Sequence, residues 1–344
     1  MTQAYASSIR DGYRKRQTRR NTVSWLLTAL VLCLCGLMLI KGNTDYPLAT
    51  VFKVLWGDNI KGATYAISTL RLPRMLTGLL SGIAFGMAGN TFQTMLRNPL
   101  ASPDIIGITT GSSAAAVFCI MMLGLGQNAV SVISLVAGLA VALFVYALSQ
   151  GGRFSGGRLI LIGIGVQAML GAFVSFLLLK GAEYDVANAL RWMRGSLNGA
   201  RMESVPVLLA VVTVCCLLII LLTKHLQILE LGEEAATTLG IRTNATRLML
   251  MLLSVLLTAF ATAATGPIAF ISFLSGPIAA KLTGTGHASP IPAGLMGATL
   301  VLGADLIGQF AFATRYPVGV ITGILGAPYL IFLLIRINRK GGAA

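Results

Sequence analysis

One stretch indicates the fold class of this chain most clearly: RLPRMLTGLLSGIAFGMAGNTFQTMLRNPLASPD, residues 71–104. Arg71 and Arg74 open it, a mostly apolar run follows, and a turn with two prolines closes it. A helix needs about 20 apolar residues to cross a bilayer core. Residues 73–95 supply that length, so the sequence predicts a membrane-spanning helix followed by a rigid turn, with Asp104 capping the next helix.

Composition extends this conclusion to the whole chain. Of the 344 residues, 56% are hydrophobic and 11% are charged, and the mean hydropathy is +0.81. Soluble domains carry about 25% charged residues, so an ordinary soluble globule is excluded. The net charge of +15 is divided by long apolar runs. That pattern indicates cytoplasmic loops of a membrane protein rather than a nucleic-acid partner.

The predicted fold class is all-α: a polytopic membrane protein with about ten transmembrane helices and both termini cytoplasmic. Residues 1–22 are a basic cytoplasmic tail, 23–337 a single transmembrane domain, and 338–344 a cytoplasmic C-terminal tail. Gly276-Pro277 interrupts the eighth predicted helix. The ten predicted helices cover 23–42, 73–95, 104–124, 128–149, 158–180, 204–223, 246–267, 269–283, 291–312 and 317–337.

Several polar or helix-breaking residues lie at membrane depth. The amide of Gln93 needs a polar partner there, either in a cavity or on a neighbouring helix. Irregular backbone at this depth usually lines a cavity or a moving element. The candidates for a translocation path are Gln93, Asn98, Pro99, Gly266, Pro267, Pro317 and Gly319.

Residues 229–240 predict a short helix outside the membrane. Glu233 and Glu234 suit a helix N-terminus, and Gly240 suits its C-terminal end. The segment is either a solvated connector or a docking helix with a small-residue face for a soluble partner. The candidate docking residues are Leu231, Gly232, Glu233, Glu234, Ala235, Ala236, Leu239 and Gly240.

The sequence also lacks the usual marks of catalysis. It holds no G-x-x-x-x-G-K-[ST] motif for binding ATP, and its five cysteines are not at metal-ligand spacing. We therefore predict no catalytic residue, no metal and no directly bound cofactor. Asp305 is the only acid well inside a predicted helix, which is thin support for a stand-alone ion-coupled secondary transporter.

Together these motifs resemble the permease subunits of the iron-siderophore and vitamin B12 ABC importers, the type II importers. The chain is most similar to the second permease subunit of ferric-enterobactin importers, through RLILIGIGV at 158–166 and GSLNG at 195–199. The family's Pro-His-x-x-Arg pattern is absent near Gly276-Ala280. The other matching stretches are RLPR at 71–74, RNPLA at 97–101, the 231–240 helix, GPI at 266–268, PVG at 317–319 and GAP at 326–328.

The resemblance implies a non-catalytic subunit in a bacterial inner membrane that imports a ferric siderophore, with a ferric catecholate as the substrate. Its partners would be a second permease subunit, sister or identical, two ATP-binding subunits that use the ATP, and a periplasmic siderophore-binding protein. The 229–240 helix would be the coupling helix. Arg71 and Arg74 would face acidic residues of the binding protein, unless they only snorkel at a helix start.

Overall fold

Each of the ten predicted spans corresponds to a helix. The computed structural model describes residues 2–149, 156–284 and 289–341, and every regular element in these ranges is helical. Eight of these helices are long and apolar enough to cross a membrane, while α4 and α12 are shorter. The all-α, multi-pass fold is therefore confirmed. The ten are α1 (Thr2–Ile40), α3 (Leu72–Met95), α4 (Ile108–Met122), α5 (Gln127–Ser149), α6 (Gly156–Lys180), α8 (Val205–Leu221), α11 (Thr243–Thr265), α12 (Ile271–Thr283), α13 (Pro290–Phe310) and α14 (Val318–Gly341).

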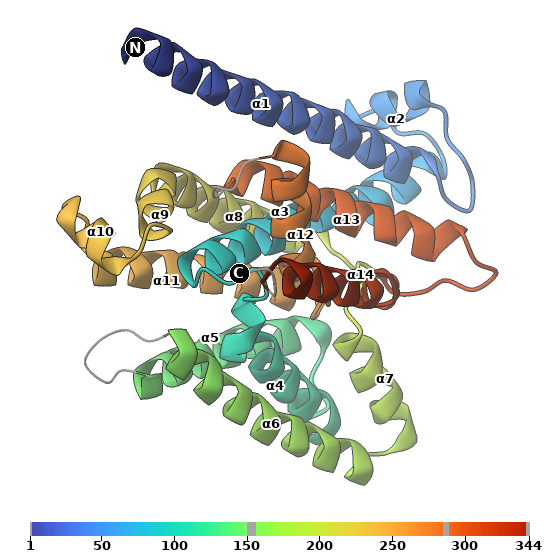
Figure 1. Cartoon of the computed structure of the whole chain (residues 1–344). Helices are drawn as coiled ribbons and strands as arrows, with labels where there is room; N and C mark the ends of the chain where they lie inside the picture. Colours follow the sequence, from blue (N-terminus) through green and yellow to red (C-terminus); the bar gives the residue numbers. More distant parts are fainter. Residues whose placement is uncertain (1, 150–155, 285–288, 342–344) are drawn as a thin grey trace.

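Short helices occupy several connections between these spans, and the last of them lies within the segment 229–240 that the sequence predicts as a short helix. They are α2 (Leu48–Leu55), the π-helix η1 (Tyr65–Arg71), the 3₁₀ turns η2 (Pro103–Ile106) and η3 (Met202–Ser204), α7 (Glu183–Met193), α9 (Thr223–Leu229) and α10 (Glu233–Thr238). Figure 1 shows α9 and α10 at one end of the long helices, called the inner end below, and α2 and α7 at the other, the outer end.

The two predicted tails continue the terminal helices. α1 includes the basic segment from Thr2 onward without a break, and α14 extends to Gly341. Residues 342–344 lie outside the described part of the chain. The basic segment is thus a helical extension of the first span.

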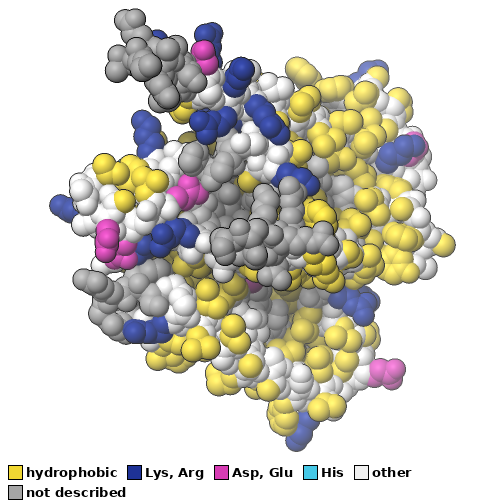
Figure 2. Space-filling model, in the orientation of Figure 1, with side chains coloured by type: hydrophobic (Ala, Val, Ile, Leu, Met, Phe, Trp, Pro, Cys, Tyr) yellow, Lys and Arg dark blue, Asp and Glu magenta, His cyan; other side chains and the backbone are white. Residues whose placement is uncertain are grey.

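Helix α3 is the centre of the bundle and packs against α11, α12 and α13. Its glycines allow this approach: a β-carbon at Gly86 would lie 2.2 Å from the Ala293 carbonyl oxygen, and one at Gly89 1.7 Å from that of Ser272. Small residues let helix backbones meet closely in lipid. The outer faces of α1, α6 and α14 are apolar, and Figure 2 shows hydrophobic side chains spread over the bundle surface.

Two local expectations are wrong. Pro277 does not interrupt the eighth helix, because α12 continues through it as a single helix. Asp104 does not cap the third helix: Ser102 caps η2, and α4 begins only after Gly107, whose φ of +87° is left-handed. A left-handed residue of this kind separates two helical segments most easily when it is glycine.

Candidate translocation and docking sites

The predicted docking segment forms α10 at the inner end, between two glycines with positive φ. Gly232 has φ +114° at its start, and Gly240 has φ +82° just after it. Arg247 Nη1 donates to Glu233 Oε2 at 3.1 Å, which ties α10 to α11. Of the expected small-residue face, Ala236 is fully buried, whereas Thr237, Thr238 and Gly240 are exposed.

The surface of α10 and its flanking residues also includes apolar and acidic side chains. Leu231 and Leu239 are 64% and 61% exposed, and Glu234 is exposed between them. Large apolar side chains exposed on a segment outside the bundle are typical of a protein-docking surface. The inner side of this segment belongs to one apolar core with α3, η2 and α9, which includes Phe92, Met95, Ile106, Leu226, Leu229, Ala236 and Ile241.

The turn after α3 returns into the bundle rather than staying at its end. A β-carbon at Gly163 of α6 would lie 2.0 Å from the Ile105 carbonyl oxygen, and Gln167 Nε2 donates to the Asp104 carbonyl oxygen at 2.6 Å. At the α-helical rise, these two α6 residues lie about 10 and 16 Å along the helix from Gly156. Segment 97–107 therefore reaches membrane depth. Non-helical backbone is tolerated there only when protein covers it or it lines a water-filled space.

Asp104 brings a carboxylate to this depth, and the sequence reading, which weighed only Asp305, missed it. Its oxygens accept hydrogen bonds from the hydroxyls of Ser102 at 2.9 Å, Ser272 at 3.0 Å and Thr109 at 3.0 Å. The hydrogen bonds from Ser272 and Thr109 fasten the turn to α12 and α4. The signal in the sequence was an acidic residue that directly follows a proline and precedes an apolar helix.

Gln93 and Pro277 are linked through one backbone carbonyl group of α12. Proline has no N–H, so the carbonyl four residues earlier in a helix loses its donor. That carbonyl belongs to Phe273, and Gln93 Nε2 donates to it at 2.9 Å. A β-carbon at Gly276 would lie 2.1 Å from Gln93 Oε1, so glycine makes room for the amide. Of the two alternatives, the structure shows the Gln93 amide hydrogen-bonded to a neighbouring helix, α12. A place for Gln93 in a translocation path stays a prediction.

Asn98 and Pro99 stay within the turn itself. Asn98 Oδ1 accepts a hydrogen bond from the Leu100 N–H at 2.9 Å, while Pro99 is exposed. The preceding Arg97 has φ +50°, a left-handed conformation that non-glycine residues rarely adopt. The backbone conformation of this turn is thus restricted. Any role of Asn98 and Pro99 in a translocation path remains a prediction.

At the outer end, three breaker-rich stretches that are far apart in sequence meet. A β-carbon at Gly195 would lie 2.3 Å from the Pro267 carbonyl oxygen, and one at Gly319 1.9 Å from that of Arg194. The Gly319 N–H donates to the Gly195 carbonyl at 3.1 Å. Gly266, with φ +70°, and Pro317 flank this junction. Glycine is required here because backbone meets backbone.

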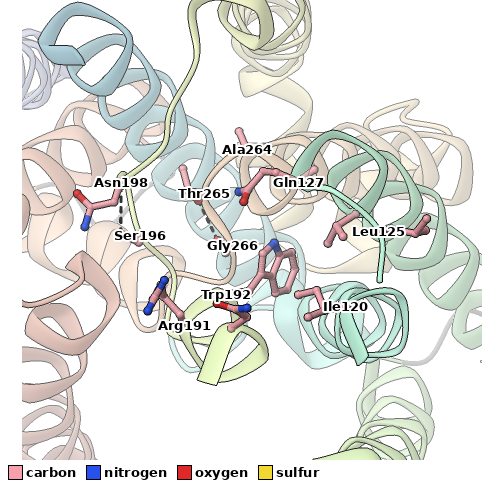
Figure 3. A pocket seen from close by; sticks show the side chains of 13 residues that line it. Ile120, Leu125, Gln127, Arg191, Trp192, Ser196, Asn198, Ala264, Thr265 and Gly266 are labelled. Atoms are coloured by element: carbon pink, nitrogen blue, oxygen red, sulfur yellow. Dashed lines mark hydrogen bonds between the residues drawn. The ribbon is translucent and has the colours of Figure 1, made fainter. Parts of the chain in front are cut away.

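A pocket of about 270 Å³ opens beside this junction. Figure 3 shows Arg191 and Trp192 of α7 next to the Ser196 turn and the end of α11. The Arg191 side chain is exposed, and no ion pair of it is found within the described residues. Other lining residues with polar side chains are Gln127, Asn188, Ser196, Asn198 and Thr265. The pocket offers one cation, one indole and several amides to a small anionic group.

Arg74 is engaged inside the chain. Its Nε and Nη2 donate to the two carboxylate oxygens of Asp305 at 2.8 and 2.7 Å, and its Nη1 donates to Asn198 Oδ1. Gln309 Nε2 donates to the same carboxylate at 2.7 Å. Asp305 is 1% exposed, so the acid that supported an ion-coupled transporter is occupied as a buried structural partner.

Arg71 binds the end of α1. It donates to the carbonyl oxygens of Leu39, Ile40 and Thr44 at 2.8, 2.7 and 2.6 Å, and its guanidinium lies 5.1 Å from the Tyr46 ring centroid. A cation on the last carbonyls of a helix complements the helix dipole. Both arginines thus hold helices together, and contact with a binding protein stays a prediction for them.

The turn beside Arg71 carries an acid with a shifted pKa. A hydrogen bond from Lys41 holds the pKa of Asp45 below its ordinary value, and Gly42 N–H donates to the same carboxylate at 3.3 Å.

Within the described residues, no group of three or more His, Cys, Asp or Glu side chains could hold a metal ion.

A bundle of membrane helices with an exposed helical segment at one end and a polar pocket at the other defines a multi-pass membrane transport protein. The chain belongs to the FecCD transport family, whose family model matches residues 27–336. It is 37% identical to the ferric enterobactin transport system permease protein FepG of Escherichia coli, over 94% of this chain and 98% of that protein. It is 35% identical to the achromobactin transport system permease protein CbrC of Dickeya dadantii, over 95% of each.

A solved structure agrees in fold. A metal-chelate type ABC transporter in an inward-facing conformation superposes with a TM-score of 0.81 and 25% identity, over 92% of this chain and 99% of that one. The similarity therefore includes the whole bundle rather than a common fragment.

Proposed function

We propose that this chain is the permease subunit of an ABC importer in a bacterial inner membrane and that it moves a ferric siderophore, with a ferric catecholate as the substrate. The observation that carries the proposal is α10: a short helix outside the bundle, exposed through Leu231, Glu234 and Leu239, that rests on the core of α3 and η2. A partner that moves α10 would thereby move the turn at membrane depth.

The partners follow from the same geometry. A separate ATP-binding subunit would dock on α10 and use the ATP, since this chain has no phosphate-binding motif of its own. A sister or identical permease would cover part of the apolar surface. The names of the relatives support the catecholate, because ferric enterobactin permeases match nearly the full length of the chain.

The outer end would receive the periplasmic binding protein. Arg71 and Arg74 remain candidates, but their guanidinium groups already bind within the chain. The exposed Arg191 at the pocket rim offers a cation with no such internal ion pair among the described residues. We therefore add Arg191 to the docking candidates, as a contact for an acidic side chain of that protein.

Leu239→Glu tests the proposal. Leu239 is exposed, so a glutamate at this position buries no charge within the subunit, and the subunit is expected to fold. The new charge would lie in the interface with the ATP-binding subunit, and docking is expected to fail. We expect the ATP-binding subunit to be lost on co-purification, together with uptake of radiolabelled ferric catecholate. Asn59→Glu, an exposed site between α2 and η1, is the control and should leave co-purification unchanged. Normal co-purification and uptake with Leu239→Glu would exclude α10 as the docking site.

A further inference from the structure

The basic extension of α1 has no role in the proposed transport path. Residues 10–20 hold six cations, Arg10, Arg14, Lys15, Arg16, Arg19 and Arg20, and one acid, Asp11. Five of the six cations are exposed, and Arg20 is half-buried. Figure 1 shows this end of α1 standing clear of the other helices, and Figure 2 shows Lys and Arg side chains gathered there. The rest of the described chain therefore leaves this charge available to a partner.

Two side chains mark where this segment leaves the bundle. Arg19 Nε donates to the Leu282 carbonyl oxygen at 2.9 Å and its Nη2 to that of Lys281 at 3.4 Å, at the last turn of α12. Trp25, 75% exposed, follows a turn and a half later, where the apolar part of α1 begins. Exposed tryptophan is typical of the membrane–water interface. Arg20, the cation of this segment nearest in sequence to Trp25, thus lies about 8 Å from Trp25 along the helix.

The cations do not share one face. Successive helical residues turn by about 100°, so Arg14, Lys15 and Arg16 point in three different directions. A protein partner would contact one side of such a helix, whereas lipid headgroups surround a helix that passes through their layer. The helix is also continuous into the span, so its cations are held near the membrane surface.

We propose that the basic segment of α1, residues 10–20, binds the anionic headgroups of the membrane that α1 crosses. Each cation close to an anionic surface favours binding by about fivefold. The attraction decays over about 8 Å at physiological salt, so the cations nearest Trp25 contribute most. The segment then fixes the position and tilt of α1, which packs on α12 and α13.

Trp25 provides a local readout. The full chain carrying Trp56→Phe and Trp192→Phe keeps Trp25 as its single tryptophan. It is reconstituted in vesicles of phosphatidylcholine and phosphatidylglycerol, with one or the other brominated on its acyl chains to quench fluorescence on contact. We expect brominated phosphatidylglycerol to be preferred at Trp25 by about fivefold or more, with the preference falling at high salt.

Arg16→Gln with Arg19→Gln and Arg20→Gln removes the cations nearest Trp25 and should reduce this preference to near equality. The matched control, Arg16→Lys with Arg19→Lys and Arg20→Lys, keeps the charge and should keep the preference. Equal quenching by both lipids in the parent chain, or an unchanged preference in the glutamine variant, overturns the proposal. Loss of the ATP-binding subunit from the glutamine variant, with quenching unchanged, would overturn it in favour of a protein partner.

Discussion

Helices α3 and α6 are similar in length but opposite in position. The most apolar 18-residue window of the span that ends with α3 has a mean hydropathy of 1.2, and 83% of it is buried. The corresponding window of α6 has a mean hydropathy of 2.2, and 22% of it is buried. The less apolar helix is therefore the central one. Lipid is as apolar as leucine, so apolar character does not drive a helix into the bundle, whereas close packing and polar contacts do.

Glycine shows the same contrast. In α3, added β-carbons at Gly82, Gly86 and Gly89 would each lie less than 3.0 Å from backbone atoms of α12 or α13. In α6, Gly163 also meets backbone closely, but nothing lies within 4 Å of such an atom at Gly165 or Gly171. One residue type therefore has two roles, and only the neighbouring backbone distinguishes them.

The largest effect should come from adding a methyl group to the central helix. Gly89→Ala places a β-carbon against the Ser272 carbonyl oxygen, which cannot move without shifting α12. We expect a cost of about 3 kcal/mol or more, because overpacking against backbone cannot be relieved by a side-chain rotation. The measurements are the monodisperse fraction in detergent and the midpoint of thermal unfolding. Gly165→Ala in α6 is the matched control and should change stability by about 0.5 kcal/mol at most. Equal losses in the two variants would remove the distinction between the helices.

A smaller but still large effect should follow from breaking the ion pair between α3 and α13. Arg74→Ala leaves the carboxylate of Asp305, 1% exposed, without its cation. Removing one partner of a buried pair costs about 3 kcal/mol, and replacing both with leucine should recover part of it. Thermal unfolding of the two single variants and the double variant measures this. If Asp305→Asn abolished uptake while stability stayed normal, a structural role would be insufficient and ion coupling would return as an explanation.

The smallest of the three effects concerns Gln93. Gln93→Leu removes the donor to the Phe273 carbonyl oxygen and should cost about 1 kcal/mol, a typical value for a hydrogen bond between membrane helices. Pro277→Ala restores a helical N–H for the same carbonyl, so it should offset much of that loss. A double-mutant cycle by thermal unfolding gives the coupling between the two sites. Strictly additive effects would show that Gln93 does not act on this carbonyl.

Much of the fold could be predicted from the sequence because the signals are local. Spans such as 73–95 are visible as runs of apolar residues, and glycines and acids locate α10 at 233–238. The surface that α10 exposes could not be predicted, because Ala236 turns inward only when it joins the core with Phe92. Asp104 was missed for a similar reason: nothing in the sequence shows that α6 lies beside its turn.

Chain length and hydropathy set how many helices can lie in lipid, so the amino-acid sequence is enough to define a helical membrane protein with a short exposed helix near 229–240. Tertiary structure alone decided which polar groups are partners. Arg74 and Asp305 are 231 residues apart, Gln93 and Phe273 are 180 apart, and Gly195 and Gly319 meet backbone to backbone. In lipid such contacts determine which helix lies at the centre, because apolar character does not drive a helix into the bundle.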